Sequence, residues 1–170
     1  MSLTISEADL TDERDGQAVL DLLQAYAADP MGGGSQLSDE VRVNLIGRLR
    51  QVDGRLVLLA RVDGIPAGLA VAFPSFSTFR AAPVLNLHDL AVDPKFRGRG
   101  IGRALLNEVE SYARNRGCCR VTLEVRRDNA AAQALYTSEG FSSGSAPQEF
   151  WTKPLAFPSV RTSTPNVSQQ

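Results

Sequence analysis

The sequence is poor in the residues on which disulfide, membrane and signal-bearing proteins depend. Its 170 residues contain two cysteines, one tryptophan and one histidine. The cysteines, Cys118 and Cys119, are adjacent, and neighbouring cysteines bridge only with strain, so they make no disulfide framework. No apolar run approaches the roughly 18 residues of a membrane span. Residues 1–16 are polar and acidic and lack the features of a secretory signal, so we expect a soluble, cytoplasmic protein with no membrane partner.

An excess of basic residues is also missing. Lysine and arginine together number 18 against 19 acidic residues, which gives a formal net charge of −1. Nucleic-acid-binding domains usually show a strong basic excess, so no nucleic-acid partner is expected. The remaining composition is ordinary, with 43% hydrophobic and 22% charged residues. It excludes collagen-like and disordered classes and is typical of one globular domain.

Strand and helix patterns alternate through residues 1–157 without a repeat or a linker. Two strand-like runs flank Asp63-Gly64, a strong signal for a tight hairpin turn. Later runs predict a strand–helix–strand unit, and final strand segments are expected at Phe141 and over 149–155. A hairpin followed by such a unit indicates a mixed α/β (α+β) sheet with one parallel pair.

Two segments are predicted to be flexible. Residues 31–35, Met-Gly-Gly-Gly-Ser, separate the first two predicted helices and are interpreted as a flexible turn. Residues 158–170 have almost no apolar content and are expected to form a polar, flexible tail. The predicted organisation is therefore one domain over 1–157 followed by that tail.

The most informative segment is the glycine-rich turn between a strand ending near Val92 and a helix beginning at Ile101. It reads Arg97-Gly-Arg-Gly-Ile-Gly102. Glycines let successive N–H groups converge on an anion, and a helix N-terminus adds further donors. Three arginines supply full charges, so the turn predicts a pyrophosphate site; a turn that binds nothing is the alternative. Neither a P-loop nor a dinucleotide fingerprint fits, because Gly-Lys-Ser/Thr is missing and Arg103 stands at the sixth position from Gly98.

Two motifs carry a family resemblance. Arg97-x-x-Gly100-x-Gly102 follows a strand that reads Leu-His-Asp-Leu-Ala-Val-Asp-Pro, and Asn129-x-x-Ala-x-x-Leu-Tyr-x-x-x-Gly-Phe141 comes one helix and one strand later. This ordered pair resembles the motifs of the GNAT superfamily of N-acetyltransferases. Within the superfamily, it is most similar to the small-amine (polyamine-type) members. The resemblance implies a mostly antiparallel sheet of about six to seven strands with a splayed parallel pair and about four helices.

The resemblance also implies acetyl-CoA as cosubstrate and needs no metal. Main-chain amides of the strand end would bind the acetyl group and pantetheine, and those of the turn would bind the pyrophosphate. The matching positions are Leu90, Ala91, Val92, Arg97, Gly98, Arg99, Gly100, Ile101, Gly102, Arg103 and Asn129. Dimerisation is common in the family, so a homodimer is a further implication.

Three residues are candidates for proton transfer. Tyr136 matches the family tyrosine that protonates the thiolate leaving group; otherwise it is a core aromatic residue. His88 lies two residues before Leu90, on the same side of a regular strand, and an imidazole can act as base. Asp89 then faces the other side unless a bulge re-aims it.

The acceptor is expected to be the primary amine of a small molecule, attacked directly in a ternary complex. Tyr26 and two aromatic residues of the loop before the motif strand, Phe76 and Phe79, are the candidate acceptor-binding residues. Two alternatives remain open at this point: an acetyltransferase for protein lysines or N-termini, and a non-catalytic CoA-binding module.

Overall fold

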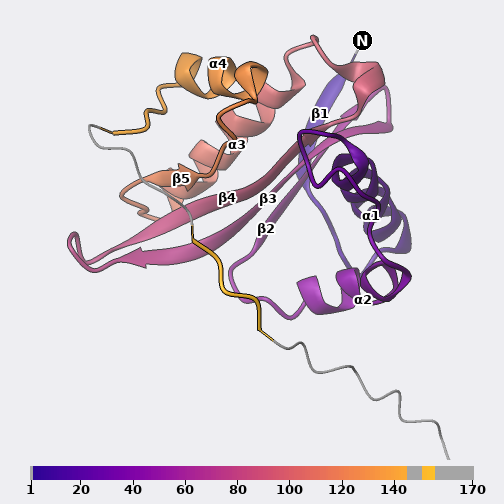
Figure 1. The fold of residues 1–170 in the computed structure, drawn as a ribbon, viewed down its shortest axis with the longest axis horizontal. Coiled ribbons are helices and arrows are strands. Elements are labelled where there is room, and N and C mark those ends of the chain that lie inside the picture. The colour runs from indigo at the N-terminus through magenta and orange to yellow at the C-terminus, as the bar shows by residue number, and fades with distance from the viewer. Residues whose placement is uncertain (1, 145–150, 156–170) are drawn as a thin grey trace, which may run out of the picture.

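The computed structural model describes residues 2–144 and 151–155, and they form one sheet between two helical layers (Figure 1). The sheet has five strands in chain order. They are β1 (Leu3–Glu7), β2 (Leu56–Val62), β3 (Ile65–Ser77), β4 (Ala82–Val92) and β5 (Val121–Leu123). All neighbours are antiparallel except β4 and β5, which are parallel. The mixed α/β class with one parallel pair is therefore confirmed.

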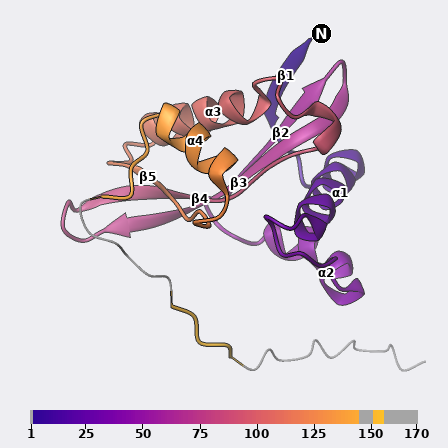
Figure 2. The ribbon, with the colours of Figure 1, turned by 45° about the horizontal axis from the view of Figure 1, so that its top comes forward.

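Helices cover both faces of the sheet (Figures 1 and 2). α1 (Glu13–Ala28) and α2 (Asp39–Leu49) lie on one face, and α3 (Ile101–Asn115) and α4 (Ala130–Ser138) lie on the other. The short 3-10 turn η1 (Pro94–Phe96) links β4 to the glycine-rich turn. Because the sheet is covered twice, there are two apolar cores, one against α1 and one against α3.

The predicted strand number is too high for the described residues. Residues 141–144 and 151–155 are irregular, and residues 145–150 and the predicted tail over 158–170 lie outside the described part of the chain. Trp151 and Leu155 are 84% and 81% exposed, so the apolar side chains of 151–155 gain no burial against the sheet. Alternation of side chains predicts a strand only where one face is buried.

The parallel pair is short and opens at one end. Leu85, Asn86 and Leu87 of β4 pair with Val121, Thr122 and Leu123 of β5. Beyond Leu87, β4 continues to Val92, whereas β5 ends at Leu123. The structure thus leaves one edge of β4 unpaired by any described strand over its last residues.

A β-bulge interrupts β4 where this opening begins. Val71 of β3 faces Asp89, but its neighbour Ala72 faces Leu87, so His88 has no partner in the register. A bulge adds one residue and re-aims the side chains around it. Leu85 and Leu87 accordingly pack on the α3 side, whereas Ala91 packs on the α1 side.

Gly68 lets the α3 layer approach the sheet closely. A Cβ there would lie 2.8 Å from the Ala91 carbonyl oxygen and 3.2 Å from Ile101 Cγ2. We expect Gly68→Ala to lower the free energy of unfolding by roughly 1–3 kcal/mol in urea denaturation, because backbone cannot move aside cheaply. Gly47→Ala, at an exposed helix position with nothing within 4 Å, is the control and should stabilise the protein instead. Equal stability of the two variants would contradict this role.

Candidate active site

The unpaired edge of β4 presents main-chain donors to the opening beside β5. The Asp93 amide donates to the Ala67 carbonyl on the β3 side at 2.9 Å. Amides alternate in direction along an antiparallel strand, so the N–H groups of Val92 and Leu90 point to the opening. The Val92 carbonyl faces the same way, because it accepts a hydrogen bond from Arg97 Nε at 3.2 Å. This edge can bind an extended amide-containing chain as a further strand would.

The glycine-rich turn continues this edge. Gly98 and Gly100 have φ values of +75° and +78°, and a Cβ at either position would meet nothing within 4 Å. Glycine is therefore needed for backbone conformation rather than for space. Gly100 caps α3 without a side-chain hydrogen bond, and no acidic residue lies in the first turn of the helix. The first amides of α3 and the turn thus form a main-chain site suited to a phosphate.

The three arginines of this region have protein partners. Arg97 pairs with Asp29 at 2.7 Å, and Arg103 pairs with Glu139 at 2.6 Å. Arg99 lies over the Phe96 ring at 5.3 Å. The acidic partners of Arg97 and Arg103 are distant in sequence, so the fold brings these pairs together.

Several other residues that are predicted to bind the coenzyme also have structural roles. A Cβ at Gly102 would lie 3.2 Å from Leu135 Cδ2, so this glycine lets α3 approach α4. Ile101 is buried in the core against α3, and Ala91 is buried in the core against α1. The Asn129 side chain caps α4 by accepting from the Ala132 amide at 3.1 Å.

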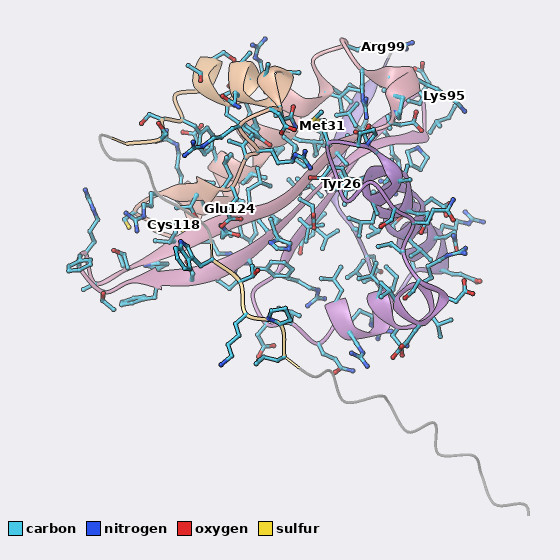
Figure 3. The ribbon with its side chains drawn as sticks, viewed as in Figure 1. Tyr26, Met31, Lys95, Arg99, Cys118 and Glu124 are labelled. Carbon is cyan, nitrogen blue, oxygen red and sulfur yellow. The ribbon has the colours of Figure 1, made fainter. Side chains whose placement is uncertain are left out.

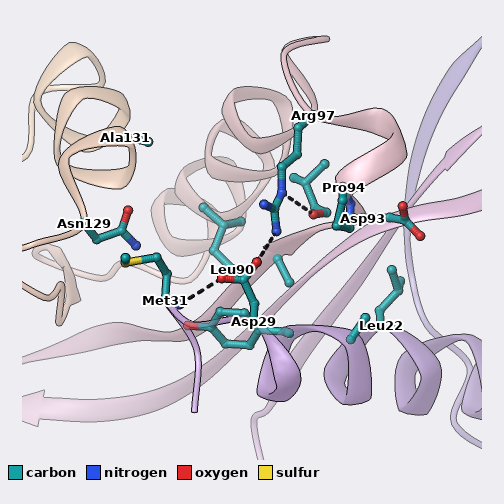
Figure 4. A pocket seen from close by; sticks show the side chains of 13 residues that line it. Leu22, Asp29, Met31, Leu90, Asp93, Pro94, Arg97, Asn129 and Ala131 are labelled. Atoms are coloured by element: carbon teal, nitrogen blue, oxygen red, sulfur yellow. Dashed lines mark hydrogen bonds and ion pairs between the residues drawn. The ribbon is translucent and has the colours of Figure 1, made fainter. Parts of the chain in front are cut away.

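A cavity of about 240 Å³ lies between the β4 edge and the end of α1 (Figure 4). Its walls combine three separate stretches of the chain, and the predicted strand-end residues take part. The lining residues are Leu22, Ala25, Tyr26, Asp29, Met31, Leu90, Ala91, Val92, Asp93, Pro94, Arg97, Asn129 and Ala131. The cavity thus connects the glycine-rich turn with the acceptor-side residue Tyr26.

The bulge changes the expected directions of His88 and Asp89. Leu90 packs on the α3 side, but the His88 ring lies edge-on to Phe73, 5.7 Å between centroids, on the α1 side. The prediction that His88 shares the side of Leu90 is therefore wrong, because the extra residue reverses the alternation. Asp89 pairs with Val71 in the register and so faces the α1 side as well.

The electrostatics of this face are set by burial. Burial raises the pKa of Asp89, and the nearby His88 opposes this effect. Burial also raises the pKa of Tyr26, and the carboxylates of Asp89 and Asp29 raise it further. Burial, with a smaller contribution from Tyr26, raises the pKa of Tyr136 to about 12. Both tyrosines therefore keep their protons at neutral pH and are able to donate hydrogen bonds.

Glu124 is a carboxylate that the sequence analysis did not single out. It follows Leu123, the last residue of β5, at the point where β4 and β5 separate. Two residues earlier, the Thr122 hydroxyl accepts a hydrogen bond from Asn86 Nδ2 of β4 at 3.1 Å, and Glu124 itself is exposed. Figure 3 labels it near the middle of the molecule, as it does Tyr26. Its signal in the sequence was its position five residues before Asn129.

The two loop aromatics do not reach the cavity. Phe76 and Phe79 are 62% and 101% exposed and lie at the far end of the β3–β4 hairpin (Figure 1). Neither lines the cavity that Tyr26 enters. Of the predicted acceptor residues, the structure therefore brings only Tyr26 to the site.

Two further findings concern the described residues. Within 2–144 and 151–155, no helix is long and apolar enough to cross a membrane. In the same part of the chain, histidine, cysteine and carboxylate side chains form no group of three or more arranged to hold a metal ion.

Comparison with known proteins identifies the class that this fold and cleft define. Residues 19–141 match the model of the acetyltransferase (GNAT) family. The chain therefore belongs to the GNAT family, whose members are acyltransferases that use acetyl-CoA. The family resemblance predicted from the two motifs is thus confirmed.

Two of the similar curated proteins are N-acetyltransferases by name. The chain is 46% identical over 76 residues to the N-alpha-acetyltransferase RimI of Mycobacterium tuberculosis, covering 44% of this chain and 46% of that protein. It is 43% identical over 66 residues to the ribosomal protein bS18-alanine N-acetyltransferase of Salmonella typhimurium, covering 39% of this chain and 45% of that enzyme. The chain thus spans less than half the length of these relatives.

Solved structures share the fold. A ribosomal-protein-alanine N-acetyltransferase from Brucella melitensis biovar Abortus superposes with a TM-score of 0.66 at 21% identity, covering 92% of this chain and 100% of that one. The acetyltransferase AAC(6')-Iy, bound to a bisubstrate analogue of CoA, superposes with a TM-score of 0.74 at 20% identity, covering 91% and 100%. At these identities the likeness concerns the fold alone, so the small-amine flavour expected from the sequence has no support here.

Proposed function

We propose that this chain is an acetyl-CoA-dependent N-acetyltransferase whose acceptor is the α-amino group of a protein or peptide N-terminus. The observation that carries the proposal is the open edge of β4. The Leu90 and Val92 amides line it, and the glycine-rich turn follows it in the chain. Main-chain donors can bind acetyl-CoA there without any rearrangement of the sheet.

The main-chain amides and titratable side chains of this region suit direct transfer of the acetyl group from acetyl-CoA to the amine. The amine nitrogen forms the new N–C bond while the C–S bond of the thioester breaks. The Leu90 N–H is placed to stabilise the oxyanion that develops on the acyl oxygen. Asp89 or Glu124 accepts the proton that the attacking amine loses, directly or through a water, with His88 beside them. Tyr136 returns a proton to the thiolate, and its raised pKa keeps that proton in place at neutral pH.

Two observations favour an α-amine over a small polyamine. Phe76 and Phe79, the rings expected to enclose a small acceptor, lie outside the cavity. The relatives reported above carry names of enzymes that act on protein amines. An α-amine also has a pKa near 8 against about 10.4 for lysine, so its neutral fraction at pH 7 is larger by a factor on the order of 10².

Release of CoA from acetyl-CoA tests the acceptor class. The panel contains peptides with a free N-terminus, the same peptides with an acetylated N-terminus and an internal lysine, spermidine, and an aminoglycoside. We expect release only with free N-termini, and mass spectrometry should place the acetyl group on the α-nitrogen. Turnover with spermidine or the aminoglycoside alone would contradict the proposal and restore the small-amine interpretation. Binding of acetyl-CoA without turnover would favour the non-catalytic alternative.

The raised pKa of Tyr136 predicts how kcat depends on pH in the alkaline range. Because its pKa is raised to about 12, its protonated form persists well above pH 8. We therefore expect kcat, measured at saturating substrates, to change by less than about twofold between pH 8 and 10. A fall with its midpoint below pH 10 that Tyr136→Phe removes would show that this hydroxyl ionises earlier than the structure implies.

A further inference from the structure

Asp29 uses its two carboxylate oxygens in two directions. It lies directly after α1 and lines the cavity. Oδ2 accepts from Arg97 Nη2 at 2.7 Å, and Oδ1 accepts from the Met31 amide at 2.8 Å (Figure 4). The Asp29 side chain is 18% exposed and the Arg97 side chain 54%, so this ion pair lies at the rim of the cavity.

Arg97 is the partner on the coenzyme side. It begins the glycine-rich turn, and its Nε donates to the Val92 carbonyl on the open edge of β4. A guanidinium has five N–H donors, of which these contacts use two. The Arg97 side chain is 54% exposed and lines the cavity, so the remaining donors can meet a phosphate while Asp29 still holds the group.

Met31 is the partner on the acceptor side, and the turn that carries it is rigid. The amides of Gly32 and Gly34 donate to the Asp29 carbonyl at 2.9 and 3.1 Å. A Cβ at Gly32 would lie 2.0 Å from the Tyr26 carbonyl oxygen, so the turn packs directly on the end of α1. These contacts tie the turn over residues 31–35 to Asp29 and to the end of α1.

We propose that Asp29 is a positioning residue that couples the two substrate sites, holding Arg97 for the coenzyme with one oxygen and the Met31 turn for the acceptor with the other. This inference rests on the proposed acetyl transfer and states how its two sites communicate. Asp29 acts through Arg97 and Met31 and takes no part in proton transfer. Coenzyme bound against Arg97 therefore stabilises the arrangement of the acceptor side.

Asp29→Asn tests this coupling. We expect a roughly tenfold or greater loss of acetyl-CoA affinity in calorimetry, because the Arg97–Asp29 ion pair is replaced by a hydrogen bond from Arg97 to an uncharged amide, which holds the guanidinium less firmly. At saturating acetyl-CoA, the KM for the peptide should rise about fivefold or more while kcat stays within about twofold, a split that a global folding defect does not produce. Asp29→Glu, which keeps both oxygens, should recover part of each loss. Glu110→Gln, which breaks an α3 surface pair with Arg114 outside the cavity, should change neither quantity.

A double-mutant cycle gives the deciding result. If Asp29 acts through Arg97, Asp29→Asn should weaken acetyl-CoA binding little further in an Arg97→Ala background. Losses that multiply would overturn the proposal, as would wild-type affinity and peptide KM in Asp29→Asn. The calorimetric arm needs no acceptor, so it is independent of the acceptor assignment. A wild-type protein that binds acetyl-CoA but acetylates no peptide would overturn the proposed function instead.

Discussion

Replacing both Asp89 and Glu124 with their amides will lower kcat by roughly 10²–10⁴-fold, the usual contribution of a positioned base. Asp89 lies on β4 near the point where β4 and β5 separate, and Glu124 directly follows β5. Amides keep the shape of the side chains but cannot accept the proton of the acceptor ammonium group. Steady-state CoA release at saturating substrates measures the loss, and the acetyl-CoA affinity should stay within about threefold.

The single variants divide this loss between the two groups. Burial raises the pKa of Asp89, so as a base it would lose its charge at a higher pH than an ordinary carboxyl when the pH falls. If Asp89 is the base, kcat should fall at acid pH with a midpoint above the usual pKa range of a carboxyl group. This pH dependence should disappear in Asp89→Asn. If Glu124→Gln carries the loss instead, Glu124 is the base. His88→Gln is the comparison for the exposed imidazole beside them, and a fully active double variant would leave His88 or water alone as the base.

Gly100→Asp will abolish detectable acetyl-CoA binding, a loss of at least about 10²-fold. The new carboxylate would stand at the N-terminus of α3, among the amides that face the pyrophosphate, and would repel it. It would also occupy a φ of +78°, which L residues rarely adopt. Isothermal titration with acetyl-CoA measures the effect on affinity, and thermal unfolding shows that the chain remains folded.

Gly64→Asp is the control that distinguishes the effect of a charge at the phosphate site from the effect of backbone strain. Gly64 has a φ of +82° in the β2–β3 turn, and a Cβ there would likewise meet nothing within 4 Å. Both variants add the same side chain in the same backbone conformation, but only one adds it beside α3. We expect Gly64→Asp to bind acetyl-CoA like the wild type, and normal binding by Gly100→Asp would show that the phosphate site lies elsewhere.

Local features of the fold follow from the sequence because they depend on neighbouring residues. The hairpin at Asp63-Gly64 forms as predicted, with both residues at positive φ. The glycines at 98 and 100 also take the left-handed conformations that an anion site requires. In each case the residue type restricts the backbone at its own position, so no tertiary contact is needed to predict the outcome.

Features that depend on distant partners were predicted wrongly or missed. The strand segment expected over 149–155 is not formed by its described residues, because periodicity does not show whether a sheet edge buries the side chains. The bulge at His88 depends on a register with β3, and regular alternation gave the wrong side for that ring. The partners of Arg97 and Arg103 are also far away in the chain, so their charges were assigned to phosphate alone.

The amino-acid order by itself determined the family and the glycine-rich turn, because these depend on residue types at fixed short spacings. Only the tertiary structure decided which groups meet at the cleft. It turned His88 and Asp89 towards α1, brought Asp29 to Arg97 and left Phe76 and Phe79 away from the cavity. The physical reason is that each of these placements depends on strand register, helix packing or an ion pair between segments distant in sequence, and local propensity carries no information about them.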